Sequence, residues 1–228
     1  MRKIDFNRDW TVQKEGQERV EHVNLPHDAM LYEKRAKENK TASASAYFEG
    51  GKYIYKKIWD VDAQTAEQTN ILEFEGVYQN ARISLNGNQI AERPYGYTNF
   101  YVDLTDLLTV GQNEIQVIAD NADVPNSRWY SGSGIYRLVS LYTAGSSYIK
   151  PEGIKVQVLD QECICLRLAC VAEKAQAKIT ILDQNAVVTD MVVEDLTHLE
   201  TEGITIMIPN AKPWSAEDPH LYRVRAEL

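Results

Sequence analysis

Alternation of apolar and polar positions, with a period of two, is the pattern that most restricts how this chain can fold. Ile115, Val117 and Ala119 share one side of such a run. This period belongs to a half-buried β-strand, whereas an amphipathic helix needs apolar residues three and four apart. Helical periodicity is weak, and only residues 30–39 could form a turn of helix within a loop. The pattern therefore predicts an all-β fold.

Turn signals separate the alternating runs. Asn86-Gly87 follows the run at residues 81–85, and Asn-Gly is the preferred dipeptide of a tight β-hairpin turn. A polar, turn-rich stretch at residues 145–153 precedes six further runs, spaced roughly 8–12 residues apart, which is typical of a β-sandwich. We therefore place a domain boundary near Gly145, with one domain over residues 1–145 and another over residues 146–228.

The second domain is expected to be truncated before its last strand. An immunoglobulin-like sandwich has about seven strands, and this region contains six alternating runs. The final run reaches Leu228 with no turn or polar tail after it. Natural proteins avoid leaving such an edge unpaired. We expect the chain to be part of a longer protein, with a natural end and a frayed strand as the alternative.

Composition excludes several classes of function. The 33 acidic residues outnumber the 24 basic ones, which argues against binding a nucleic-acid backbone. No run of about 18 apolar residues is present, so no membrane span is expected. Three cysteines without a CxxC spacing, and four scattered histidines, predict neither a metal site nor a cofactor. The sparse cysteines and the polar opening MRKIDFNRDW predict a reduced, cytoplasmic location.

The segment NADVPNSRWYSGSGIYR, at residues 121–137, is the richest in groups that recognise ligands. Trp129 and Tyr130 combine apolar faces with polar edges, which suit the mixed surface of a sugar. Gly132 and Gly134 allow a close backbone approach. The same aromatic residues could instead belong to the core. The residue types alone leave both readings open.

Short motifs recur in order along the first 143 residues: FNRDW (6–10), LPHD (25–28), GGKY (50–53), FEGV (74–77), ARISLNG (81–87), PYGY (94–97), FYVDLTDL (100–107), DN (120–121) and NSRWYSGSGIYRLVSL (126–141). Together they resemble the N-terminal sugar-binding domain of glycoside hydrolase family 2, the β-galactosidase and β-glucuronidase family. The SRWY sequence at 127–130 is most similar to the β-galactosidase branch. Residues 146–228 resemble the domain that follows in that family, with WSAEDPHLY (214–222) similar to its characteristic turn.

The resemblance implies a jelly-roll (galactose-binding-domain-like) β-sandwich followed by an immunoglobulin-like β-sandwich. It also implies retaining hydrolysis of a β-glycoside by two glutamates of a (β/α)₈ barrel, a fold of ~250 residues with alternating strands and helices. Because nearly all of this chain is predicted to be β, the barrel is expected to lie outside it. We therefore expect no catalytic residue here, and interpret Glu73, Glu75 and Glu114 as solvent-facing.

Within the family, the loop before the Gly-Ile-Tyr-Arg strand contacts the sugar. The resemblance therefore implies four substrate-binding residues: Asn126, Ser127, Arg128 and Trp129. Arg128 would donate hydrogen bonds to a sugar hydroxyl, and Trp129 would pack against an apolar sugar face. Better-known members carry an acidic residue near Ser127-Arg128, so no metal site is transferred to this chain.

The expected partners are a carbohydrate, namely a β-galactoside or a related sugar, and the catalytic barrel of the same chain. The sequence also leaves open whether the longer protein is a homo-oligomer. A β-glucuronidase or β-mannosidase is the alternative within the family. Two other classes of protein also fit the sequence: a free-standing, lectin-like carbohydrate-binding module and a scaffold for assembly.

Overall fold

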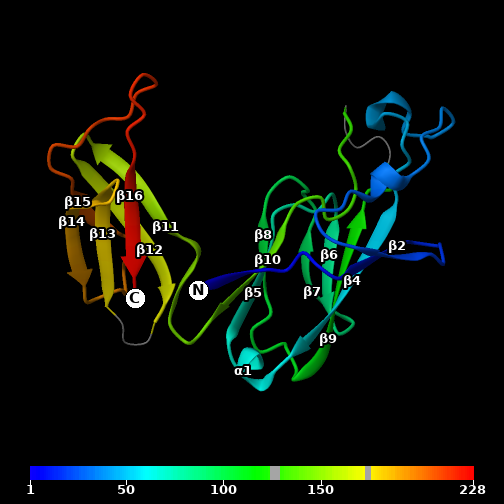
Figure 1. The fold of residues 1–228 in the computed structure, drawn as a ribbon, viewed down its shortest axis with the longest axis horizontal. Coiled ribbons are helices and arrows are strands. Elements are labelled where there is room, and N and C mark those ends of the chain that lie inside the picture. The colour runs from blue at the N-terminus through cyan, green and yellow to red at the C-terminus, as the bar shows by residue number, and fades with distance from the viewer. Residues whose placement is uncertain (124–128, 173–175) are drawn as a thin grey trace. The chain divides into compact units, whose positions relative to one another are not determined.

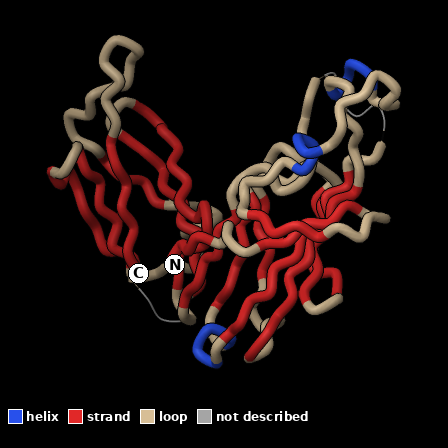
Figure 2. The backbone as a smooth tube through the Cα atoms, turned by 45° about the vertical axis from the view of Figure 1, so that its right-hand side comes forward, coloured by secondary structure: helices blue, strands red, loops and turns tan. Residues whose placement is uncertain are grey.

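The computed structural model describes residues 1–123, 129–172 and 176–228, and it is built almost entirely of strands (Figures 1 and 2). The chain divides into two compact units. One comprises residues 2–143, and the other comprises residues 144–228 together with Met1. The all-β prediction is confirmed. Each unit is described by itself below.

The described residues of the first unit form ten strands: β1 (Arg2–Asp5), β2 (Trp10–Lys14), β3 (Val20–Val23), β4 (Lys52–Val61), β5 (Thr69–Phe74), β6 (Ala81–Leu85), β7 (Asn88–Arg93), β8 (Phe100–Asp103), β9 (Gly111–Asp120) and β10 (Val139–Ala144). They make a six-stranded sheet, ordered β3-β2-β4-β9-β6-β7, and a four-stranded sheet, ordered β1-β10-β5-β8. One hydrophobic core draws side chains from both sheets, so this unit is a β-sandwich.

The register of the six-stranded sheet follows the sequence pattern. β4 and β9 pair in antiparallel fashion from Lys52↔Asp120 to Val61↔Gly111. Ile115, Val117 and Ala119 are fully buried, as the alternation predicted. The β6–β7 hairpin turns at Asn86 and Gly87, whose φ angles of 51° and 82° suit the primed turn that this dipeptide favours.

Outside residues 173–175, the second unit contains six strands: β11 (Tyr148–Asp160), β12 (Cys163–Val171), β13 (Ala177–Asp183), β14 (Ala186–Val193), β15 (Ile204–Met207) and β16 (Tyr222–Glu227). They match the six predicted runs. Two three-stranded sheets, ordered β11-β12-β15 and β14-β13-β16, enclose a separate apolar core. The unit is therefore a second β-sandwich.

In the part of the chain that the structure describes, helical structure is confined to short pieces. The stretch predicted as a turn of helix within a loop contains a 3₁₀ helix, η1 (Ala29–Tyr32), at its start. Two other pieces were not predicted: η2 (Ala42–Ser45) and α1 (Ala63–Ala66). Asp62 begins α1 by accepting a hydrogen bond from the Thr65 N–H, as an N-cap does. Four-residue helices have no periodic signature, because they are barely longer than one turn.

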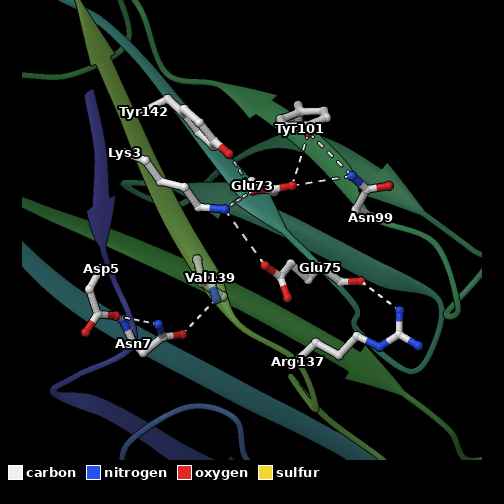
Figure 3. Close-up of polar contacts among 10 residues, drawn as sticks. All are labelled: Lys3, Asp5, Asn7, Glu73, Glu75, Asn99, Tyr101, Arg137, Val139 and Tyr142. Carbon is white, nitrogen blue, oxygen red and sulfur yellow. Dashed lines mark hydrogen bonds and ion pairs between the residues drawn. The ribbon is translucent and has the colours of Figure 1, made fainter. Parts of the chain in front are cut away.

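The expectation that Glu73 faces solvent is wrong. Glu73 lies on the side of β5 that points away from the core, yet its exposed fraction is only 6%. Lys3 Nζ donates to Glu73 Oε2 at 3.1 Å, and the Tyr142 hydroxyl donates to the same oxygen at 2.9 Å (Figure 3). The Tyr101 hydroxyl donates to Oε1 at 3.1 Å. Because these donors come from β1, β10 and β8, the carboxylate connects all four strands of its sheet. We call Lys3, Glu73, Tyr101 and Tyr142 the Glu73 cluster.

Opposing effects act on the pKa of Glu73. Burial alone would raise this pKa, but hydrogen bonds from Lys3, Tyr142, Asn99 and Tyr101 outweigh burial and lower it. The carboxylate is therefore ionised at neutral pH. Period-two reasoning missed this because it separates the two faces of a strand but does not reveal what covers each face.

The other two glutamates fit the predicted exposure better. Glu114 is partly exposed and pairs with Lys56 at 3.0 Å across the β4–β9 ladder. The Glu75 side chain is 35% exposed and lies 3.9 Å from Lys3. Neither has the set of donors that surrounds Glu73.

Candidate functional site

Asp28 links its own loop to the loop at residues 129–134 through hydrogen bonds. Its Oδ1 accepts hydrogen bonds from the Ser133 N–H at 2.9 Å and the Met30 N–H at 3.1 Å. Its Oδ2 accepts from the Tyr130 hydroxyl at 2.6 Å. Gly132 has a φ of +73°, and a Cβ there would press on this carboxylate. Asp28 thus requires a glycine in the facing loop and holds Tyr130 in place.

His27 and Tyr55 form a second contact beneath this loop. His27 Nδ1 lies 2.8 Å from the Tyr55 hydroxyl, and the His27 ring stacks on Tyr32 with centroids 5.2 Å apart. Burial lowers the pKa of His27, which keeps the ring neutral at pH 7, although the Asp28 charge opposes this. Gly134 passes so close to the Tyr55 hydroxyl that a Cβ would collide with it. These contacts explain the second glycine of the motif.

Asn121 holds the same loop from the end of β9. This buried side chain donates to the Gly132 carbonyl at 2.9 Å and to Ser133 Oγ at 2.7 Å. Phe48 packs edge-on against Tyr130, with ring centroids 5.7 Å apart. The loop is therefore supported from three segments that lie far apart in the sequence.

An aromatic surface lies beside the supported loop. Trp129 Nε1 donates to the Tyr97 hydroxyl at 3.2 Å, and the Tyr95 and Tyr97 rings lie 5.7 Å apart. Trp129 and Tyr95 are 61% and 58% exposed. Large exposed rings of this kind offer flat apolar faces with polar edges. We call Tyr95, Tyr97 and Trp129 the aromatic platform.

Backbone contacts hold the platform in position. The Tyr136 hydroxyl donates to the Gly96 carbonyl at 2.8 Å, and Arg137 Nη1 donates to the Tyr97 carbonyl at 3.2 Å. Arg137 is thus a structural hydrogen-bond donor to the backbone beneath this surface. The Tyr78 ring also packs edge-on against the Tyr97 ring, with the centroids 5.2 Å apart.

The structure tests the predicted substrate-binding residues only in part. Asn126, Ser127 and Arg128 lie outside the described residues, so their role stays a prediction. Trp129 is described, and it is a surface residue rather than a core residue. Tyr95 and Tyr97 belong to the PYGY motif of the family resemblance, but the sequence predicted no role for them. Only the tertiary fold shows that the PYGY segment lies beside Trp129.

In the described residues, no group of three or more His, Cys, Asp or Glu side chains is arranged to hold a metal ion. Cys163, Cys165 and Cys170 are free thiols. Over the same ranges, no helix is both long enough and apolar enough to cross a membrane.

Comparison with known families agrees with this arrangement. Residues 9–134 match the galactose-binding domain-like profile of glycosyl hydrolase 2, and residues 168–228 match the profile of glycosyl hydrolases family 2. The chain belongs to glycoside hydrolase family 2. Its two sandwiches are accordingly the jelly-roll and immunoglobulin-like domains of that family, as the resemblance implied.

Named relatives are glycosidases. A β-galactosidase of Bacteroides ovatus is 35% identical over 72% of this chain, and a β-galactosidase of Thermoanaerobacter pseudethanolicus is 27% identical over 99%. The chain spans 21% and 33% of the lengths of these two relatives. A crystal structure of a family 2 member from Bacteroides cellulosilyticus shares the fold at 26% identity with a TM-score of 0.78, covering 99% of this chain and 33% of that one.

Proposed function

We propose that this chain is the non-catalytic, sugar-positioning part of a retaining β-glycosidase, with a β-galactoside as the preferred substrate. The observation that carries this proposal is the exposed aromatic platform beside a loop held by Asp28. Relatives named as β-galactosidases favour this substrate, whereas relatives named as putative β-glucuronidases favour the alternative. A β-glucuronidase or a β-mannosidase is the alternative within the family.

The chemistry of the described carboxylates supports a non-catalytic role. Retaining hydrolysis needs a general acid with a raised pKa and a nucleophilic carboxylate about 5–5.5 Å away. Glu73 has the opposite property, because its donors lower its pKa. Both oxygens of Asp28 already accept hydrogen bonds from the protein. The two catalytic glutamates are therefore proposed to lie in a barrel that is not part of these residues.

The platform would act by orienting the sugar. The Trp129 and Tyr95 rings would lie against the C–H face of a pyranose ring, a contact that gains from apolar area without a buried charge. Asn126, Ser127 and Arg128 precede the platform directly, and their side chains would hydrogen-bond the sugar hydroxyls. Such positioning raises the rate of a reaction whose acid and nucleophile come from another domain.

Sugar titrations of the 228-residue chain test this proposal. We expect no turnover of nitrophenyl β-galactoside, and binding of methyl β-galactoside weaker than ~1 mM, which corresponds to about −4 kcal/mol. The indole N–H resonance of Trp129 should nevertheless shift at high sugar concentration. Methyl β-glucuronide and methyl β-mannoside, titrated in parallel, rank the three candidate sugars.

A matched pair of variants controls this experiment. Trp129→Ala should abolish the sugar-dependent shifts of neighbouring signals, whereas Trp214→Ala, which removes an equally exposed tryptophan at 61%, should leave them unchanged. Measurable turnover by the pure chain would overturn the non-catalytic assignment. Affinity tighter than ~1 mM would instead favour the free-standing, lectin-like module.

A further inference from the structure

A small cleft in the first unit lies between the β2–β3 hairpin and the segment that follows β3. Its volume is about 120 Å³, a little less than the ~150 Å³ of a cavity that binds benzene. Val12 and Tyr53 line it and are 7% and 3% exposed. We call it the hairpin cleft, and its polar lining includes Lys14, Arg19, Glu21, His27, Tyr32 and Glu33. None of these residues belongs to the aromatic platform, so the cleft is a different candidate site.

A largely buried ion pair in the cleft leaves one carboxylate oxygen available. Lys14 Nζ lies 2.9 Å from Glu33 Oε1, and the two side chains are only 17% and 20% exposed. The Tyr53 hydroxyl donates to the same oxygen at 3.0 Å. Burial and the charge of Glu33 raise the pKa of Tyr53, so this hydroxyl stays protonated. Within the described residues, Glu33 Oε2 accepts no hydrogen bond, and it can therefore accept one from a ligand.

An aromatic ring with one open face stands at the same cleft. The Tyr32 ring stacks on His27, with the two planes 8° apart. His27 is itself held by Tyr55, whose hydroxyl lies 2.8 Å from His27 Nδ1. Tyr32 is nevertheless 73% exposed, because the stack covers only one side of its ring. The other side offers a flat apolar face with a polar edge.

The charges that line the cleft balance one another. Lys14 pairs with Glu33, and Arg19 Nε lies 3.2 Å from Glu21 Oε1. An anion in the cleft would be repelled by the two glutamates, and a cation would be repelled by the two basic side chains. The lining thus offers both donors and acceptors without a net charge. This combination fits a neutral ligand with several hydroxyl groups.

We propose that the hairpin cleft is a second carbohydrate site, which binds one neutral sugar residue and takes no part in hydrolysis. The site is additional to the aromatic platform and does not depend on it. The C–H face of the sugar ring lies on the open face of Tyr32. One edge of the ring enters the cleft, where a hydroxyl donates to Glu33 Oε2 and another accepts from Lys14 or Arg19. A saccharide held there stays near the rest of the enzyme, which raises its effective concentration.

A titration of the 228-residue chain with methyl β-galactoside, followed by nuclear magnetic resonance, tests this site. We expect the Tyr32 ring signals and the Gln17 and Glu33 amide signals to shift. Half-saturation should lie above ~1 mM, because the cleft encloses only one edge of the sugar. Methyl β-glucuronide, which carries a carboxylate, should bind the cleft more weakly. Absence of these shifts at the highest soluble sugar concentration, or stronger binding of the glucuronide, would overturn the proposal.

Substitutions of the aromatic ring locate the binding. Tyr32→Ala should weaken binding at the cleft about tenfold, through loss of the apolar face, whereas Tyr32→Phe keeps the ring and should bind like the unmodified chain. Leu31→Ala is the matched control, because Leu31 is the neighbouring residue of η1, is 61% exposed and does not line the cleft. Equal affinities of Tyr32→Ala and the unmodified chain, or an equal loss from Leu31→Ala, would contradict the site.

Glu33→Gln tests the charge balance. It removes one negative charge and leaves Lys14 without its ionic partner, so the glucuronide should gain affinity relative to the galactoside. The amide spectrum of the variant shows whether it is folded before the two sugars are compared. An unchanged preference in the folded variant would mean that Glu33 does not set the ligand class, contrary to the proposal.

Separate signals distinguish this site from the function proposed above. Trp129→Ala should remove the shifts at the aromatic platform and keep those at the hairpin cleft, and Tyr32→Ala should do the reverse. Loss of both sets of shifts from Tyr32→Ala would indicate a single site and overturn the second one. Shifts at the cleft without any at Trp129 would support the second site and contradict the sugar-positioning role of the platform.

Discussion

The Glu73 cluster and the exposed side chains of Ile154, Val156 and Val158 on β11, which form the β11 strip, show two different conditions of a sheet face. Glu73 lies outside its sandwich core, yet it is 6% exposed because tyrosine and lysine side chains from the neighbouring strands cover it. Val158 stands opposite the buried Ile164 of β12 and so lies on the core-facing side of its sheet, yet it is 71% exposed. Position on a face therefore does not determine burial in either region.

The two regions differ in whether their side chains can hydrogen-bond to one another. A carboxylate among donors gains hydrogen bonds that repay its loss of water. Aliphatic side chains stabilise the fold only through the apolar area that they remove from water. An exposed strip removes little of this area. The Glu73 cluster is thus complete in itself, whereas the β11 strip stays exposed.

Removing the carboxylate should produce the largest loss of stability. Glu73→Ala leaves Lys3, Tyr101 and Tyr142 without their shared acceptor, and we expect the first unit to lose about 3 kcal/mol, because hydrogen bonds to a largely buried carboxylate contribute more than an exposed ion pair. Urea unfolding measures this loss. Glu114→Ala, which breaks the exposed pair with Lys56, should cost under about 1 kcal/mol. Equal losses would show that the Glu73 cluster contributes no more to the free energy of unfolding than an exposed ion pair.

A second carboxylate sharpens the comparison, because Asp28 also has several donors but lies in a loop. Asp28→Ala should cost about 2 kcal/mol, since it leaves the Ser133 and Met30 N–H groups without an acceptor. The Tyr130 hydroxyl loses its partner as well. Amide exchange at Ser133 should speed up, and sugar-dependent signals of Trp129 should weaken. Unchanged exchange at Ser133 would show that the loop is held by other contacts.

Acid should weaken the Glu73 cluster by a smaller amount. The folded-state pKa of Glu73 lies below its usual value, so its contribution to stability is present above the unfolded-state pKa and is lost as pH falls through the folded-state pKa. Unfolding midpoints of the first unit, recorded from neutral pH downward, should fall below about pH 4.5. Glu73→Gln should flatten this dependence. A Gln variant with the same pH profile would assign the effect to other carboxylates.

The smallest effect is expected at the β11 strip. Val158→Ala in the isolated chain should change the free energy of unfolding by less than about 0.5 kcal/mol, as at other exposed sites. Its buried partner provides the contrast, because Ile164→Ala should cost about 2–4 kcal/mol. Thermal unfolding of the second unit measures both. A large loss from Val158→Ala would mean that the strip is already covered in solution.

Sequence reasoning succeeded where a short-range signal was sufficient. Alternation predicted the strands around Ile115 and Ile181, and Asn86-Gly87 predicted its hairpin, because side-chain direction and turn geometry depend on adjacent residues. Trp129, which was predicted to contact the sugar, is exposed, and the contact itself stays a prediction. Its partners could not be predicted, since Tyr97 and Asp28 approach this loop from distant parts of the chain.

By itself, the sequence determined the all-β class, the positions of the most regularly alternating strands and the family, because all three are encoded in local period and in ordered motifs. Only the tertiary structure decided which carboxylate is buried, which tyrosines flank Trp129 and which side of β11 is uncovered. The physical reason is that burial and hydrogen bonding depend on which strands become neighbours in a sheet. That choice joins residues such as Lys3, Glu73 and Tyr142, which are remote along the chain.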